Sequence, residues 1–142
     1  MRERPPKVFI DTNVWFSFLY GSVNCEKLIN AHTKGRVKAV MSRQILEETV
    51  RNLKEKIPHT IAVFEQFIKS NPPIIIKDPG RVSKKISGLV SKEDRFIIGS
   101  AISARIKYFV TGNVKDFKRN EIKRKFRIEV LTPREAVEKL NL

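Results

Sequence analysis

Short apolar runs alternate with segments of helical periodicity along this 142-residue chain. Such runs are typical of buried strands in a parallel sheet. The expected strands cover residues 8–10, 37–41, 108–111 and 128–131, with 74–76 as either a strand or a buried extended piece. The segments at 14–35, 45–53, 58–68 and 92–107 carry apolar residues at helical spacing, and Thr132-Pro133 opens a closing helix. This alternation predicts a single α/β domain over residues 1–142, built around a mostly parallel sheet.

The first strand-to-helix transition, within KVFIDTNVWFSFLY at 7–20, carries the first candidate functional residue. Asp11 directly follows the strand at 8–10, and a helix-like pattern resumes at Val14. Open α/β sheets bind ligands at the carboxyl ends of their strands, where this carboxylate would lie. The alternative is that Asp11 and Asn13 only turn the chain and cap a helix. Both interpretations are compatible with this stretch alone.

A second candidate acid lies in the helix after Ser42, and two adjacent glutamates compete for the role. The arc of this helix that faces the core contains Ile45, Leu46, Thr49, Val50 and Leu53. At roughly 100° per residue, Glu47 and Glu48 each fall about 60° outside opposite edges of that arc. The helical wheel therefore does not choose between them. Both are also compatible with solvated positions that favour the helix N-terminus electrostatically.

The third candidate, Asp94, has a sharper helical phase. The predicted buried stripe of its helix consists of Ile97, Ile98, Ala101 and Ile102. Asp94 precedes the first two of these residues by three and four positions, which places it on the same stripe, whereas Glu93 falls outside it. A carboxylate on a buried face is costly unless it is paired, hydrogen-bonded or bound to a metal. The alternative is a helix cap with its charge at the rim.

The fourth candidate cluster follows the strand at 108–111. Thr111, Asn113 and Asp116 come at or just after the carboxyl end of this strand. A threonine and an asparagine at this position can orient a water or a phosphate oxygen, and Asp116 can add a carboxylate. The alternative is a plain loop in which Gly112 supplies the turn.

Acids from separate elements that meet at one edge of a sheet predict a Mg²⁺ or Mn²⁺ site, because these hard ions take oxygen ligands. The rest of the chain is strongly basic, with 29 Lys and Arg against 15 Asp and Glu, a net charge of +14. Such an excess favours binding to polyanions, most simply nucleic acid, over a merely solubilising surface. The densest basic run, a candidate for contact with a nucleic-acid backbone or alternatively a solvated helix face, is Lys118, Arg119, Lys123, Arg124, Lys125 and Arg127.

The composition excludes several other classes of protein. A lone cysteine, Cys25, allows neither an internal disulfide nor a thiolate-rich zinc site. No apolar run approaches the roughly 18 residues of a membrane span, and the start of the chain has no secretion signal, so we expect a cytoplasmic protein. His32 and His59 lie in helical segments away from every motif, and we expect both at the surface.

Four motifs in this order resemble those of the PIN-domain ribonucleases: VFIDTNV at 8–14, SRQILEE at 42–48, KEDRFIIGSA at 92–101 and YFVTGNVKDF at 108–117. The resemblance covers nearly the whole chain and implies a three-layer α/β/α sandwich. It assigns the family's first and third acids to Asp11 and Asp94. The second falls best on Glu48, six residues after Ser42. Many members have an aspartate where this chain has Asn113, so Asp116 would take the fourth acidic role.

The resemblance implies a Mg²⁺- or Mn²⁺-dependent endonuclease for single-stranded or structured RNA, of the stand-alone VapC-like kind, with an antitoxin partner and a homodimeric state. A PIN-like domain with an impaired site that binds RNA or a protein is the alternative. Two other classes are disfavoured. A phosphoaspartate enzyme of the haloacid-dehalogenase type has a second aspartate where this chain has Asn13, and no G-x-G-x-x-G motif for a dinucleotide follows the first strand.

Overall fold

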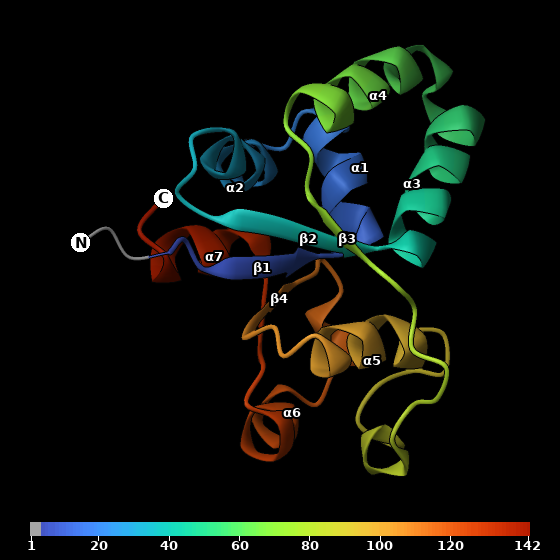
Figure 1. Ribbon diagram of the computed structural model, residues 1–142, viewed down its shortest axis with the longest axis vertical. Helices are drawn as coiled ribbons and strands as arrows, with labels where there is room; N and C mark the ends of the chain where they lie inside the picture. The colour runs from blue at the N-terminus through green and yellow to red at the C-terminus, as the bar shows by residue number, and fades with distance from the viewer. Residues whose placement is uncertain (1–3) are drawn as a thin grey trace.

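The computed structural model describes residues 4–142, which form one five-stranded sheet flanked by seven α-helices (Figure 1). The strands are β1 (Lys7–Ile10), β2 (Lys38–Ser42), β3 (Ile74–Ile76), β4 (Tyr108–Val110) and β5 (Glu129–Leu131). The helices are α1 (Thr12–Tyr20), α2 (Val23–Thr33), α3 (Arg43–Lys56), α4 (Ile61–Ser70), α5 (Arg95–Ser103), α6 (Arg119–Phe126) and α7 (Pro133–Lys139). Three single-turn 3₁₀ helices complete the set: η1 (Pro58–Thr60), η2 (Lys84–Ile86) and η3 (Val114–Asp116).

All strand pairings in the sheet are parallel, in the order β3-β2-β1-β4-β5. The predicted α/β fold is therefore confirmed, and residues 74–76 are a strand. Helices α1 to α4 lie in the connections that step from β1 to β3, whereas α5 and α6 lie in the connections that return toward β5. Because parallel crossovers are right-handed, the reversal of direction places these two groups on opposite faces. Figure 1 shows these two layers, and α7 joins the first by packing on α2.

The strand order reverses between β1 and β4, the two central neighbours. From β1 the chain continues into α1 on one face, and from β4 it continues toward α6 on the other. The carboxyl ends of these two strands therefore diverge and leave a crevice, the usual ligand position in open α/β sheets. The Asp11 backbone N–H donates to the Val110 carbonyl at 3.0 Å, which extends the β1–β4 pairing to the edge of this crevice.

Aromatic side chains join the helical layers to the sheet. Trp15 of α1 is fully buried, and its Nε1–H donates to the Ile10 carbonyl at 3.2 Å. Its ring packs edge-to-face against Phe64 and Phe67 of α4, each at a centroid distance of 6.1 Å. These contacts hold α4 above α1. None of the helices within residues 4–142 has the length and apolar character needed to cross a bilayer.

Helix α5 is shorter than the periodicity predicts, because it spans Arg95–Ser103 instead of 92–107. At its start, the Asp94 backbone N–H donates to the Ser91 carbonyl, which makes a turn of residues 91–94. At its end, Arg105 adopts a left-handed conformation with φ of 56°. The Ile106 N–H then bonds back to the Ala101 carbonyl at 3.0 Å, and this bond closes the helix.

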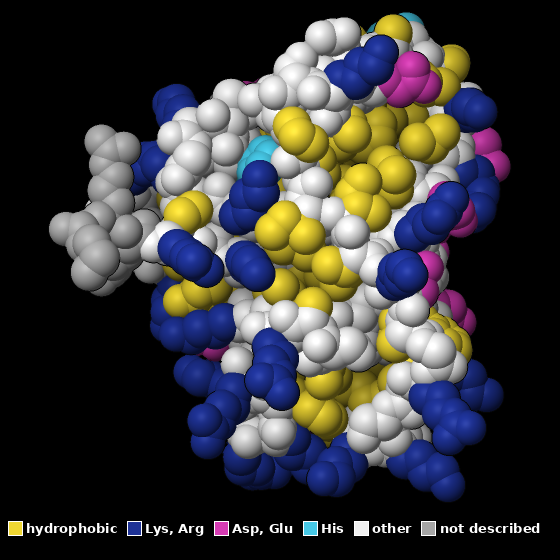
Figure 2. Space-filling model, in the orientation of Figure 1, with side chains coloured by type: hydrophobic (Ala, Val, Ile, Leu, Met, Phe, Trp, Pro, Cys, Tyr) yellow, Lys and Arg dark blue, Asp and Glu magenta, His cyan; other side chains and the backbone are white. Residues whose placement is uncertain are grey.

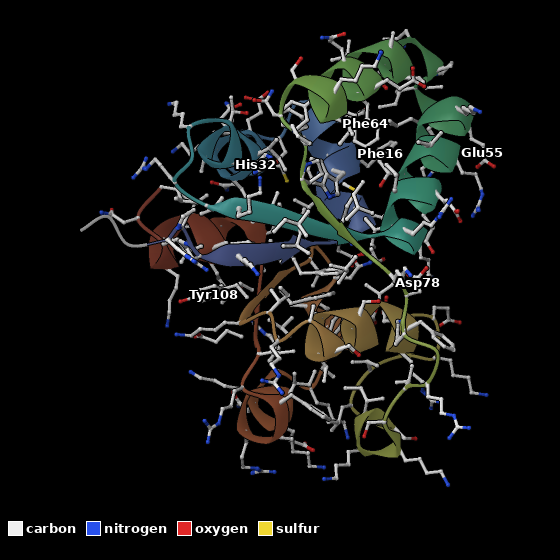
Figure 3. All side chains as sticks on the ribbon, in the orientation of Figure 1. Phe16, His32, Glu55, Phe64, Asp78 and Tyr108 are labelled. Atoms are coloured by element: carbon white, nitrogen blue, oxygen red, sulfur yellow. The ribbon has the colours of Figure 1, made fainter. Side chains whose placement is uncertain are left out.

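The expectation that His32 lies at the surface is wrong, because its side chain is only 7% exposed on α2 (Figure 3). Its Nδ1 accepts the Ala39 N–H of β2 at 3.1 Å, which leaves Nε2 to donate to the Asn71 carbonyl at 2.9 Å. The imidazole thereby joins α2, β2 and the end of α4. Helical phase alone did not reveal this position, because both partners are backbone atoms outside α2. His59 is exposed, as expected.

We expect His32→Phe to lower the free energy of unfolding by about 1–3 kcal/mol, because the buried Ala39 N–H loses its acceptor. The matched control is His59→Phe on the exposed η1 turn, which should change it by less than about 0.5 kcal/mol. Urea unfolding of both variants measures the difference. Equal stability of the two variants would contradict a structural role for His32.

Candidate active site

The carboxyl ends of β1 and β4 open into a cavity of about 320 Å³ beneath α1, α3 and the start of α5. Its lining is rich in acidic and amide groups. The lining residues are Asp11, Thr12, Asn13, Phe16, Ser17, Glu48, Asn52, Lys56, Glu93, Asp94, Ile97 and Asn113. Three of the four predicted acids, Asp11, Glu48 and Asp94, are therefore brought together from three separate elements. We refer to this cavity as the acidic cavity.

Asp11 is the most deeply buried of these acids, with 5% of its surface exposed. Its Oδ1 accepts the Thr12 backbone N–H at 2.8 Å, and its Oδ2 accepts the Thr111 hydroxyl at 2.9 Å. Asp11 is also the N-cap residue of α1. The capping and the functional interpretations are therefore compatible, since a single carboxylate starts the helix and faces the cavity.

Thr111 holds the Asp11 carboxylate through a fully determined set of hydrogen bonds. The Asn13 side-chain oxygen accepts the Gly112 N–H at 2.8 Å, so the Asn13 amide nitrogen must point to the Thr111 oxygen, 3.3 Å away. The Asn113 backbone N–H also donates to that oxygen, at 3.2 Å. The hydroxyl proton of Thr111 is therefore left for Asp11. Because Thr111 is fully buried and its hydroxyl oxygen already has these three partners, the hydroxyl is oriented toward Asp11.

Glu48 and Glu47 point in different directions from α3. Glu48 lines the acidic cavity, where its Oε2 accepts the Thr12 hydroxyl at 3.1 Å and its Oε1 accepts the Gln44 amide at 3.0 Å. Glu47 lies outside the cavity and pairs with Arg43 at 3.6 Å, with 64% of its side chain exposed. The geometry therefore favours Glu48 over Glu47 as the acid of this helix.

Asp94 lies at the start of α5 and is half-buried. It makes no side-chain cap for the helix. Its Oδ2 instead accepts the Ser91 hydroxyl at 2.7 Å, and the residue lines the acidic cavity. The cap alternative for Asp94 is thus not supported by the structure.

Asn113 and Asp116 occupy the outer side of the site. Asn113 is exposed and lines the acidic cavity, whereas Asp116, also exposed, lies in η3 outside its lining. Asp116 still affects the site electrostatically, because its charge raises the pKa of Asp94. The structure thus brings the fourth predicted acid near the cavity without placing it in the wall.

Comparison with protein families decides the affiliation of the chain. The family model described as PIN domain matches residues 7–115. This chain belongs to the PIN domain family. A search of the curated protein sequences finds no match.

Solved structures share the fold of this PIN domain over nearly its full length. A chain of the Salmonella typhimurium VapBC complex bound to DNA superposes with a TM-score of 0.64, at 20% identity, covering 90% of this chain and 98% of that one. The VapBC2 complex of Rickettsia felis, bound to a DNA fragment from its promoter, gives 0.62 at 15% identity, covering 89% and 98%. A toxin–antitoxin complex from Klebsiella pneumoniae gives 0.59 at 18% identity, covering 89% and 97%.

The acids of this PIN domain repel one another without a basic partner. Among the described residues, none of Asp11, Glu48, Asp94 and Asp116 forms an ion pair with a lysine or arginine. The pKa of Asp11 is raised to about 6, chiefly by burial. The charges of Asp94 and Glu48 also raise this pKa, and the hydrogen bonds from Thr111 and Thr12 lower it. Burial is also the main cause of the raised pKa of Asp94. A divalent cation would relieve this accumulation of negative charge.

The donor set of the acidic cavity fits a hard divalent ion in its chemistry, because it consists of carboxylate, hydroxyl and amide oxygens. Within residues 4–142, however, no three His, Cys, Asp or Glu side chains stand close enough to hold one ion together. Mg²⁺ usually keeps several of its waters, so one or two direct carboxylate ligands suffice for it. Asp11, Glu48 and Asp94 are the residues that would hold such an ion here.

The predicted nucleic-acid contacts of the basic run divide into two groups. Arg119 donates to Glu135 at 2.8 Å and to the Val130 carbonyl at 3.3 Å, and Lys123 pairs with Glu129 at 3.5 Å. These two residues therefore fasten α6 to its neighbours, which makes them weaker candidates for the predicted contact with a nucleic-acid backbone. The exposed members without an ion pair among the described residues are Lys118, Arg124, Lys125 and Arg127. Figure 2 shows basic side chains gathered at this end of the molecule, around α6 and η2.

Several supporting residues of the site were not predicted. The Thr12 hydroxyl and the Gln44 amide both donate to Glu48, and the Ser91 hydroxyl donates to Asp94. Gln44 precedes Glu48 by four residues, and Ser91 precedes Asp94 by three, so both pairs carry a local spacing signal. The Thr12–Glu48 contact joins α1 to α3 and has no such signal.

The raised pKa of Asp11 predicts an inverted pH dependence of stability in metal-free protein. The folded state holds a proton on Asp11 up to about pH 6, whereas the unfolded state releases it near the ordinary value of 3.8. Folding therefore takes up a proton in this window, and the Asp11 contribution falls by about 3 kcal/mol as pH rises through it. Chemical unfolding of the parent and of Asp11→Asn at pH 4 to 7 in EDTA isolates this contribution. Parallel stability curves would contradict the raised pKa.

Proposed function

We propose that this PIN domain is an endoribonuclease that requires Mg²⁺ or Mn²⁺ and cleaves single-stranded RNA, including unpaired segments of structured RNA. The observation that carries the proposal is the convergence of Asp11, Glu48 and Asp94 on one cavity at the reversal of strand order. Support also comes from the net charge of +14, which attracts a polyanion to a site that is itself acidic. The match to the PIN domain family supports the same reaction class.

The chain's own residues have distinct roles in this proposal. A divalent ion held by the cavity acids would supply a nucleophilic water at neutral pH and neutralise charge on the scissile phosphate. Thr111 and the Thr12 N–H fix the Asp11 carboxylate, and Gln44 and Ser91 fix Glu48 and Asp94. Asn113, exposed at the rim, orients a phosphate oxygen, and Asp116 adds negative charge near Asp94.

A VapC-like toxin is the physiological form that we infer for this nuclease, with a protein antitoxin as its partner. The support is that the structural neighbours are VapBC or other toxin–antitoxin complexes, whose chains this PIN domain matches over nearly their full length. A homodimeric state remains part of the prediction. Purification of the chain with the product of an adjacent small gene, followed by a test of whether that product blocks RNA cleavage, examines the toxin proposal.

The second candidate function is a catalytically impaired PIN domain that binds RNA or a protein. Two observations favour it: Asn113 stands where many family members have an aspartate, and Asp116 lies outside the cavity lining. Cleavage of single-stranded RNA with Mg²⁺ or Mn²⁺ that stops with EDTA supports the nuclease. Binding without cleavage in any of these conditions supports the impaired domain.

We expect Glu48→Gln to reduce metal-dependent RNA cleavage by at least ~100-fold. Residues that only hydrogen-bond to a metal ligand already affect activity by up to that factor, and a direct ligand should matter more. Glu47→Gln is the matched control, since it makes the same chemical change one residue away on the outer side of α3. It should cleave at the parental rate. Initial rates with Mn²⁺, and the rise in melting temperature that Mn²⁺ gives, measure both effects.

In these assays Glu48→Gln should also lose most of the stabilisation by Mn²⁺, while Glu47→Gln keeps it. Similar losses in both variants would contradict a specific role for Glu48. Full cleavage by the parent in EDTA would contradict the requirement for a metal.

We expect RNA affinity to fall steeply with salt, and the side chains of α6 to differ in their share of this effect. Arg124→Gln should reduce the slope of log affinity against log salt by about 0.7, the value for one phosphate contact to a single strand. Arg119→Gln should leave the slope unchanged and instead lower the free energy of unfolding by up to about 1 kcal/mol, since it breaks the pair with Glu135. Fluorescence anisotropy titrations over a salt series, with urea unfolding, test both. Equal slope changes in the two variants would contradict this division.

A further inference from the structure

A pair of aromatic side chains on α1 extends from the acidic cavity to the molecular surface. Phe16 and Tyr20 are four residues apart and therefore lie on the same side of the helix. Their rings stack with a centroid distance of 6.1 Å and an interplanar angle of 16°. Phe16 lines the acidic cavity, whereas Tyr20 is 75% exposed. The two rings thus form one stepped aromatic surface that begins beside the acids and ends in solvent.

A single cation stands beside this aromatic surface. Lys56, from the last turn of α3, places its Nζ 5.4 Å from the centre of the Phe16 ring. It is the one lysine or arginine among the residues that line the acidic cavity, and it is exposed. Figure 3 shows Phe16 on the side of α1 that is turned toward α3. Aromatic faces and a cation are therefore combined at one edge of an otherwise acidic site.

This combination matches the chemistry of an unpaired nucleotide. A nucleobase presents a π-face that stacks on aromatic side chains with little regard to sequence, and its phosphate requires a cation. The bases of a duplex are already stacked on each other, so only a single strand can use such a surface. An exposed tyrosine held parallel to a neighbouring ring is also already ordered, which lowers the entropic cost of stacking on it.

We propose that Phe16 and Tyr20 form a base-stacking platform for single-stranded RNA beside the acidic cavity, with Lys56 contacting the phosphate of the stacked nucleotide. This inference rests on the proposed function in taking RNA as the ligand, and it adds the feature that selects unpaired strands. The platform holds the base on α1 while the backbone continues past Lys56 toward Asp11 and Glu48. Cleavage therefore occurs next to an unpaired base.

Binding of two RNA oligonucleotides of equal length and charge, measured in EDTA, tests the platform without any turnover. One carries normal bases, and the other carries abasic residues at its central positions. The parent should bind the first about 10-fold more tightly, the factor expected for one stacked base. Tyr20→Leu should abolish this preference, and Tyr20→Phe should keep it, because phenylalanine retains the ring. Lys56→Gln should weaken binding of the oligonucleotide with normal bases and lower its salt slope by about 0.7.

Phe96→Leu is the matched control, since Phe96 is a 49% exposed aromatic residue on α5 outside the cavity lining. It should keep the parental preference for bases. The proposal is overturned if the parent shows no such preference, if Tyr20→Leu retains it, or if Phe96→Leu loses it to the same extent. If Tyr20→Leu keeps the preference for normal bases, Tyr20 does not stack on RNA. That result would fit an apolar surface that contacts a protein, because leucine preserves the apolar character of the surface.

A parallel cleavage assay of the parent with Mn²⁺ separates this inference from the proposed function. A preference for bases that depends on Tyr20, without any cleavage, would support the platform and contradict the nuclease. Cleavage without that preference would support the nuclease and overturn the platform.

Discussion

The hydrogen bond from the Thr111 hydroxyl to the Asp11 carboxylate is the interaction on which the site depends. This bond connects the ends of β1 and β4, where the strand order reverses. The Asn13 amide and the Asn113 backbone N–H both donate to the Thr111 oxygen, so the Thr111 hydroxyl proton is left for Asp11. A carboxylate that is 95% removed from water needs such partners to remain ionisable. The parallel pairing of β1 with β4 sets the distance between them. The fold and the chemistry of the site are thus fixed by one set of contacts.

The acids of the acidic cavity lie close together although their negative charges repel one another. Residues from several elements hold them in place. Asp11, Glu48 and Asp94 each receive hydrogen bonds from a neutral donor, but none receives a basic partner within the described part of the chain. Neutral donors position a carboxylate without cancelling its charge. Lys56 is the one basic residue that lines the cavity, and many of the other positive charges gather around α6 and η2 (Figure 2). Separation of the two signs leaves the acids available to a cation while the basic surfaces remain available to a polyanion.

The fold was predictable from the sequence because its signals are local. Each strand is a short apolar run, and most of the helices have an apolar period of their own, so the α/β class and the parallel sheet were predicted correctly. The sequence showed α6 only as a basic segment, because Ile122 is its one buried residue. The positions of Asp11 and Asp94 at element ends followed from the same local pattern. The choice between Glu47 and Glu48 did not, because it depends on the direction of α3 relative to α1, which brings the Thr12 hydroxyl to Glu48.

The remaining differences arise from hydrogen bonds and a backbone conformation that the apolar pattern does not indicate. His32 forms hydrogen bonds with two backbone groups, the Ala39 N–H and the Asn71 C=O. The pattern of side chains along the sequence does not predict either bond. Arg119 belongs to a basic run by composition, but Glu135 and the Val130 carbonyl occupy its guanidinium. Helix α5 ends early because Arg105 adopts a left-handed conformation. Glycine is the usual residue in that conformation, so an arginine does not predict it. The contacts of His32 and Arg119 join separate elements of the fold, whereas the end of α5 is a local backbone feature that the apolar periodicity does not encode.

The burial of Trp15 has a spectroscopic consequence, because it is the only tryptophan of the chain. Its indole is enclosed by Phe64 and Phe67, and its backbone N–H bonds to the carbonyl of Asp11. Intrinsic fluorescence excited at the indole band therefore reports on a single position, four residues from the acid at the centre of the cavity. Emission from the folded chain is that of an apolar environment and moves to longer wavelength when α4 separates from α1. The protein thus carries its own optical probe of the packing that supports the site.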